Sequence, residues 1–181
     1  MRKNCANCVY LFWGITFLAA LLWRNTDLLA SGSYGSGSGS GETQSTTLAL
    51  SATPQDPSIN EFVSANKYTL EDEDGDSSDW VEIYNPNDVA FDLTGWKIAD
   101  SESTKNFPQG FTLQPHQYLI VFASGKDRYQ NGVLHTNFKI KADGERIALI
   151  NQFGETVSEI QGVALIDDIS YGRYPDGSTS F

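Results

Sequence analysis

From residue 58 onwards the chain carries short runs of Val, Ile, Tyr, Phe and Trp, separated by turn residues. None of these runs has the three-to-four-residue apolar spacing of an amphipathic helix. In Trp80–Tyr84, Val81 and Ile83 alternate with Glu82, as in a strand with one face in a core. The predicted strands are Ile59–Ser64, Trp80–Tyr84, Trp96–Ala99, Tyr118–Ala123, His135–Ile140, Arg146–Asn151, Thr156–Ile160 and Val163–Ile166.

Short strands at this spacing predict an all-β fold, namely an antiparallel β-sandwich of immunoglobulin type. A barrel is the alternative. Tyr118–Ala123 is nearly all apolar, which favours a strand buried on both faces. Asp92–Trp96 is predicted to be a turn that brings its Trp into the core, with Gly95 supplying a positive φ or close packing.

The N-terminal pattern is different, because Val9–Trp23 holds 15 residues without a charge and follows Arg2 and Lys3. A basic start and an apolar helix are typical of a secretory signal, with an uncleaved membrane anchor as the alternative. We therefore divide the chain into a signal or anchor (1–30), a flexible Gly/Ser-rich linker (31–57) and a folded domain (58–181). Either reading predicts an exported domain, secreted or tethered to the outer face of the cytoplasmic membrane.

Charge sharpens this division, since the overall net charge of −11 is unevenly spread. Residues 1–30 carry +2 and the remaining 151 residues carry −13. Such an acidic remainder argues against a nucleic-acid partner and against docking on anionic lipid. Any membrane contact is expected only through the N-terminal segment.

Both cysteines, Cys5 and Cys8, lie before the apolar run. Their spacing is found in zinc and redox sites, but one pair supplies only half of the four ligands that a structural zinc needs. The predicted domain therefore has no disulfide and depends on its core for stability.

The most unusual segment is the acidic run EDEDGDSSD at residues 71–79, in which Gly75 allows a sharp turn. Hard cations such as Ca²⁺ bind clustered carboxylates. The helix–loop–helix calcium motif is not met, because Ser77 and Ile83 stand where it requires Gly and Glu. We consider two interpretations, a solvated acidic loop and a Ca²⁺ site, and expect no other cofactor. The candidate metal ligands are Asp72, Asp74, Asp76 and Asp79.

Catalytic motifs are missing from the predicted domain. Its two histidines are His116, in an expected turn, and His135, on the polar face of an expected strand. The domain has no nucleophile elbow, paired-His zinc motif or phosphate loop. We therefore assign no catalytic residue and predict that the domain is not an enzyme. Near the C-terminus, Arg173 is expected to hold a closing loop, with partner binding as the alternative.

Several segments together resemble the bacterial form of the lamin-tail domain over residues 58–177. In the family's order they are Ile59-Asn60-Glu61, EDEDGDSSDWVEIYN (71–85), DLTGW (92–96), YLIVFASGKDR (118–128), LHTNFKI (134–140) and SYGRYPDG (170–177). The resemblance implies an immunoglobulin-like sandwich that is an accessory module of exported proteins and has no activity of its own. The family pattern usually continues past Phe181 into another aromatic segment.

These observations predict a non-catalytic binding or scaffold module whose partner is a protein or another cell-envelope component. One alternative is an N-terminal accessory domain of a larger exported hydrolase or kinase-like protein. A second alternative is a Ca²⁺-stabilised adhesion module, which the acidic segment favours.

Overall fold

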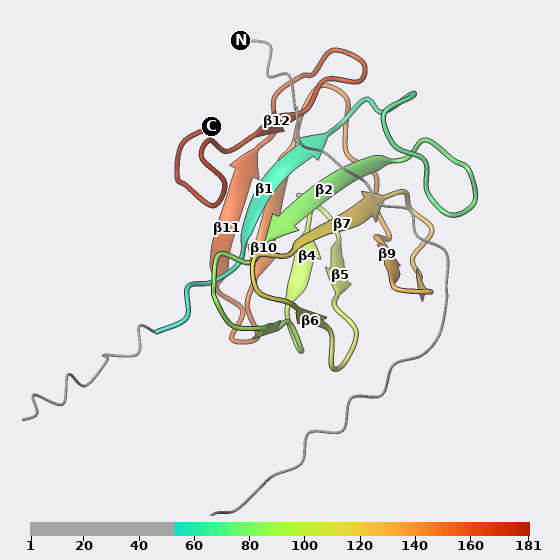
Figure 1. Ribbon diagram of the computed structural model, residues 1–181. Helices are drawn as coiled ribbons and strands as arrows, with labels where there is room; N and C mark the ends of the chain where they lie inside the picture. The colour runs from blue at the N-terminus through green and yellow to red at the C-terminus, as the bar shows by residue number, and fades with distance from the viewer. Residues whose placement is uncertain (1–52) are drawn as a thin grey trace, which may run out of the picture. The chain divides into compact units, whose positions relative to one another are not determined.

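A computed structural model describes residues 53–181, which belong to one compact unit (Figure 1). These residues form twelve strands and no helix, so none of them belongs to a helix long and apolar enough to cross a membrane. The predicted signal or anchor and most of the predicted linker lie outside the described residues. The strands are β1 (Ser58–Val63), β2 (Asp79–Tyr84), β3 (Phe91–Asp92), β4 (Lys97–Ala99), β5 (Thr104–Asn106), β6 (Thr112–Leu113), β7 (Tyr118–Ala123), β8 (Tyr129–Gln130), β9 (Val133–His135), β10 (Arg146–Ile150), β11 (Thr156–Gln161) and β12 (Tyr171–Gly172).

The strands form a six-stranded sheet in the order β12-β1-β2-β7-β9-β8 and a four-stranded sheet in the order β11-β10-β4-β5. A small sheet pairs β3 with β6. In Figure 1 the four-stranded sheet lies behind β1, β2 and β7, as the predicted sandwich requires. The named strands pair antiparallel, as expected for the predicted sandwich, except β7 and β9, which run parallel. The chain reverses twice between them, through β8, so β9 returns in the direction of β7.

One core fills the space between the two larger sheets. In β2, Val81 and Ile83 are fully buried in it, as their alternation predicts. β1 departs from simple alternation, because a bulge between Ile59 and Glu61 lets both Ile59 and Phe62 reach the core. The opposing sheet supplies Ile98, Ile147, Leu149 and Ile160.

A second, smaller cluster lies on the outer face of the six-stranded sheet. It is built from Val63, Trp80 and Phe122, with Leu70 packed against it from the β1–β2 connection. β7 therefore has apolar contacts on both faces, as predicted, except at its first residue, Tyr118, which is 45% exposed. Gly95, in the predicted turn, has a φ of 80°.

Two strand predictions are wrong. In place of a strand over His135–Ile140, β9 ends at His135, and only an isolated bridge joins Lys139 to Ser124. His135 is fully buried and does not lie on a polar face. Val163–Ile166 forms no strand, and Ile166 is exposed.

Arg173 closes the sheet edge after β12. Its Nε donates to the carbonyl of Ile59 at 2.7 Å, and its guanidinium lies 4.3 Å from the ring centroid of Phe181. A further bond reaches the carbonyl of Ser178 at 2.6 Å. These contacts favour the expected role in holding a closing loop.

Candidate cation site

The acidic segment forms a tight turn in the β1–β2 connection, and Asp72 organises it. Oδ1 of this buried carboxylate accepts hydrogen bonds from the backbone N–H groups of Asp74 (3.0 Å) and Asp76 (3.1 Å). The backbone carbonyl of Asp72 accepts from the N–H of Gly75, which has a φ of 81°. A short carboxylate and a glycine able to adopt positive φ therefore fold this loop locally.

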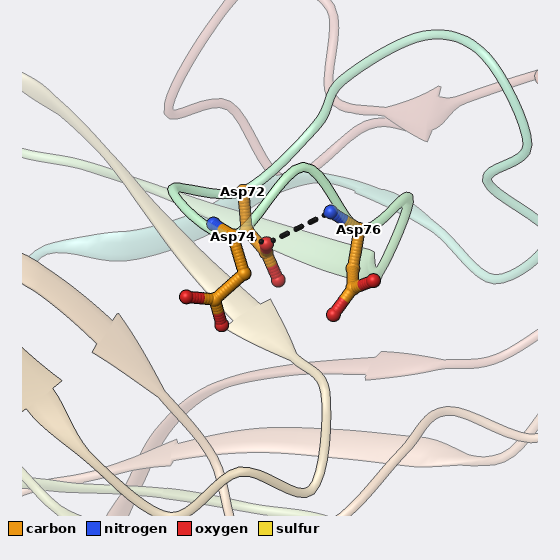
Figure 2. A group of neighbouring side chains, drawn as sticks. All are labelled: Asp72, Asp74 and Asp76. Atoms are coloured by element: carbon orange, nitrogen blue, oxygen red, sulfur yellow. Dashed lines mark hydrogen bonds between the residues drawn. The ribbon is translucent and has the colours of Figure 1, made fainter.

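Three of the four predicted ligands come together. Carboxylate oxygens of Asp72, Asp74 and Asp76 lie within 4.8 Å of one another, and Figure 2 shows the side chains projecting from the same side of the loop. Asp79 is not among them. Its Oδ1 accepts the N–H of Asn66 at 3.0 Å, and burial raises the pKa of Asp79.

A cation from the same chain lies among these carboxylates. Lys126 Nζ is 2.7 Å from Asp72 Oδ2, 2.6 Å from Asp74 Oδ2 and 2.9 Å from Asp76 Oδ2. Arg128 pairs with Asp74 and with Glu73, whose Oε1 is 2.7 Å from it. Two cations that follow β7 thus face four acids of the acidic loop, defined here as residues 71–79.

The ion pairs shift the titration of both partners. Burial alone would raise the pKa of Asp72, but the hydrogen bonds from Lys126 and from the N–H groups of Asp76 and Asp74 outweigh it and lower the pKa. Burial likewise opposes the charged form of Lys126, yet bonds to Asp72, Asp74 and Asp76 raise its pKa. The loop is therefore held in its ionised form around a resident ammonium group.

Hydrogen bonds through two buried residues, His135 and Ser124, support the acidic loop. Glu73 accepts from Nε2 of His135 at 3.0 Å, and Nδ1 of the same ring lies 2.9 Å from Ser124 Oγ. Burial raises the pKa of Glu73, but its hydrogen bonds outweigh this and lower it. An ionised carboxylate only accepts hydrogen bonds, so the ring nitrogen that faces Glu73 is the donor.

The order Ser124, His135, Glu73 is that of a nucleophile, base and orienting acid. Here, however, both Ser124 and His135 are buried, and the serine oxygen already accepts the N–H of Lys126 at 3.1 Å. A cavity of about 320 Å³ is lined by other residues, including Phe91, Trp96 and Phe153. We therefore assign a structural role to the hydrogen bonds among Ser124, His135 and Glu73, which tie the acidic loop to β7 and β9.

Sequence reasoning missed both cations and the histidine. The ion partners of Lys126 and Arg128 lie at least 50 positions earlier in the chain. The only signal was their place at the end of a buried strand, in the sequence ASGKDR. The predicted Ca²⁺ site stays a prediction: three ligands converge, and a bound ion would share or replace the position of the lysine Nζ.

The described residues form a two-layered β-sandwich, which is the architecture of immunoglobulin-like domains. The chain belongs to the lamin tail domain family, whose model matches residues 51–170. Members of this family are immunoglobulin-like, non-enzymatic domains. Among curated proteins, none matches the chain. The matched region ends just before β12, although β12 pairs with β1 in the same sheet.

Proposed function

We propose that this domain is a non-catalytic binding module of an exported protein and that it contacts its partner through two loops at one end of the sandwich. The observation that carries the proposal is a pair of locked loops that display apolar side chains. Family membership supports the non-catalytic part, and the signal-like N-terminal segment supports export.

Asp168 locks the two loops, which are residues 64–70 and 163–170. Its Oδ1 accepts the N–H of Lys67 at 2.7 Å and the N–H of Tyr68 at 2.9 Å. Its own N–H donates to the carbonyl of Ala65 at 2.9 Å. Side-chain and backbone bonds together fix one loop against the other, so little ordering remains to be done on binding.

The locked loops expose large apolar groups. Tyr68 is 87% exposed, Ile166 78% and Ile169 53%. Exposed aromatic and aliphatic side chains on ordered backbone are typical of protein interfaces, where a few such anchors supply most of the affinity. The proposed partner is therefore a protein or another envelope component with an apolar recess.

The experiment compares two double variants of the full chain in binding to cell-envelope fractions. Tyr68→Ser with Ile166→Ser should weaken retention about tenfold, as expected for the loss of two interface anchors. Phe153→Ser with Val89→Ser removes two apolar side chains from other loops, 79% and 53% exposed, and should leave retention unchanged. Equal losses in the two variants, or no retention of the unaltered chain, would contradict the proposal.

Export is tested separately by protease treatment of intact cells. The domain should be digested from outside whether the N-terminal segment is cleaved or retained. Full protection until the cells are lysed would contradict the exported location.

A further inference from the structure

A second surface lies on the outer face of the six-stranded sheet, beyond the small cluster around Trp80. There Tyr84 pairs in register with Tyr118 across β2 and β7. Their rings stack at 4.7 Å between centroids and 26° between planes. Tyr118 is 45% exposed, so the stacked pair presents aromatic surface to solvent.

Acidic groups gather beside this tyrosine pair. Asn60 is buried and lies at the β1 bulge. Its Nδ2 donates to Glu82 Oε1 at 2.9 Å and to Asp176 Oδ1 at 3.2 Å. Asp176 also accepts the hydroxyl of Tyr118 at 2.7 Å. Glu61 lies opposite Glu82 in the strand register. Hydrogen bonds from Asn60 and Tyr118 therefore hold the carboxylates of Glu82 and Asp176 side by side.

No cation within residues 53–181 pairs with these acids. The described Lys and Arg side chains that form ion pairs do so with other carboxylates. Burial raises the pKa of Glu82 to about 7, and the nearby charges of Glu61 and Asp176 push it in the same direction. The folded domain therefore disfavours the ionised form of Glu82, and a cation bound from outside would favour that form.

We propose that this tyrosine–acid face, formed by Glu61, Glu82, Tyr84, Tyr118 and Asp176, docks an arginine-bearing segment of a partner protein. Charge complementarity selects a cationic occupant. The tyrosine pair selects arginine over lysine, since a guanidinium both stacks on aromatic rings and bonds two carboxylate oxygens at once.

The inference rests on the proposed function only in treating the domain as a binding module. It names a different surface and the chemistry of its occupant. His116 also borders the face, because its Nδ1 lies 3.3 Å from the Tyr84 hydroxyl and its Nε2 lies 2.8 Å from Asp88. Protonation of Glu82 would weaken docking of a cation, so binding should be tighter at pH 8 than at pH 6.

The test titrates hexa-arginine peptide into the full chain at low salt and pH 8, with calorimetric detection. Glu61→Gln with Glu82→Gln should weaken binding about tenfold, which is the product of two surface ion pairs worth about threefold each. The matched control is Glu71→Gln with Asp143→Asn, which removes the same charge from two exposed acids elsewhere. It should change the affinity by less than about twofold.

Two further arms separate the parts of the proposal. Tyr118→Leu keeps all charges and should bind hexa-arginine about threefold more weakly than Tyr118→Phe does. Both variants lose the bond to Asp176, and only the leucine loses the cation–aromatic contact. Hexalysine should bind about threefold more weakly than hexa-arginine. Equal binding of the two peptides would overturn the selection of arginine.

Equal loss in the test and control pairs, or no binding by the unaltered chain, would overturn the docking face. The loop variant Tyr68→Ser with Ile166→Ser should bind hexa-arginine normally, so failure here and failure of the proposed function are distinguishable. Thermal unfolding of each variant verifies that it is folded, and Glu61→Gln alone serves if the double variant is not.

Discussion

The domain has two acidic regions, and they differ in where their compensating charge comes from. In the acidic loop, Lys126 and Arg128 of the same chain lie among the carboxylates of Asp72, Asp74 and Asp76. On the tyrosine–acid face, Glu61, Glu82 and Asp176 have no such partner among the described residues. The acids of this domain therefore serve in two ways: some form structural ion pairs, and others are left for a cation from outside. The position of the basic residues distinguishes the two groups.

The sharpest contrast comes from removing a central acid of the loop. Asp72→Ala should destabilise the fold by about 3 kcal/mol, because the N–H groups of Asp74 and Asp76 and the ammonium of Lys126 lose a buried acceptor. Denaturant unfolding at pH 7 measures this. The lowered pKa of Asp72 means that its contribution declines as pH falls, so the variant and the unaltered chain should converge in acid. A loss that stays constant down to pH 2 would contradict the ion-pair account.

On the tyrosine–acid face, replacing an acid is expected to stabilise the fold, not to destabilise it. Because the pKa of Glu82 is raised to about 7, the fold favours the protonated form of this side chain. The resulting contribution to stability is complete below the usual pKa of a glutamate and is lost as pH rises through about 7. Glu82→Gln should therefore stabilise the fold by about 2 kcal/mol at pH 8, after allowance for partial exposure, and hardly at all at pH 4. Glu61→Gln is the control and should change little. Destabilisation by Glu82→Gln at pH 8 would remove the distinction between the two regions.

Calcium tests whether the resident lysine can be exchanged for a metal. If the acidic loop binds Ca²⁺, a tenfold excess over Kd should add about 1.4 kcal/mol to the free energy of unfolding. Lys126→Gln frees the three carboxylates and should bind Ca²⁺ more tightly than the unaltered chain. Thermal unfolding with and without millimolar Ca²⁺ measures both. No shift in either protein would exclude the predicted site, and Asp74→Asn provides a variant in which the response should fall.

The smallest effect is expected for the hydroxyl on the docking face. Tyr118→Phe removes the bond to Asp176 and should cost about 0.5 kcal/mol, because Asp176 keeps its bond from Asn60 and is exposed. Chemical denaturation gives the value. A loss as large as that of Asp72→Ala would mean that this face, too, serves mainly to hold the fold together.

Local patterns predicted the parts of the fold that local chemistry determines. The alternation in Trp80–Tyr84 and the apolar run at Tyr118–Ala123 gave β2 and β7 within a residue. The glycine turn at Gly75 also follows from its own residues, since Asp72 folds it through bonds to the next few amides. Each of these elements carries its determinants within about six positions.

Other features depend on partners far away in the chain. β12 is two residues long and exists because it lies beside the bulged strand β1. His135 looked polar by alternation, but the sheet buries it between Ser124 and Glu73. Nothing local to the acidic run indicates Lys126, so the sequence could suggest a cation site without revealing that the chain supplies a cation itself.

The pairing of β1 with the C-terminal segment has a consequence for synthesis of the protein. Asn60 bonds to Asp176 and Gly177, and Arg173 bonds to Ile59, across more than 110 positions. A ribosome has therefore made almost the whole domain before its first strand can acquire these neighbours. Contacts of such long range form slowly, and β1 lacks these partners until residues 173–177 have emerged.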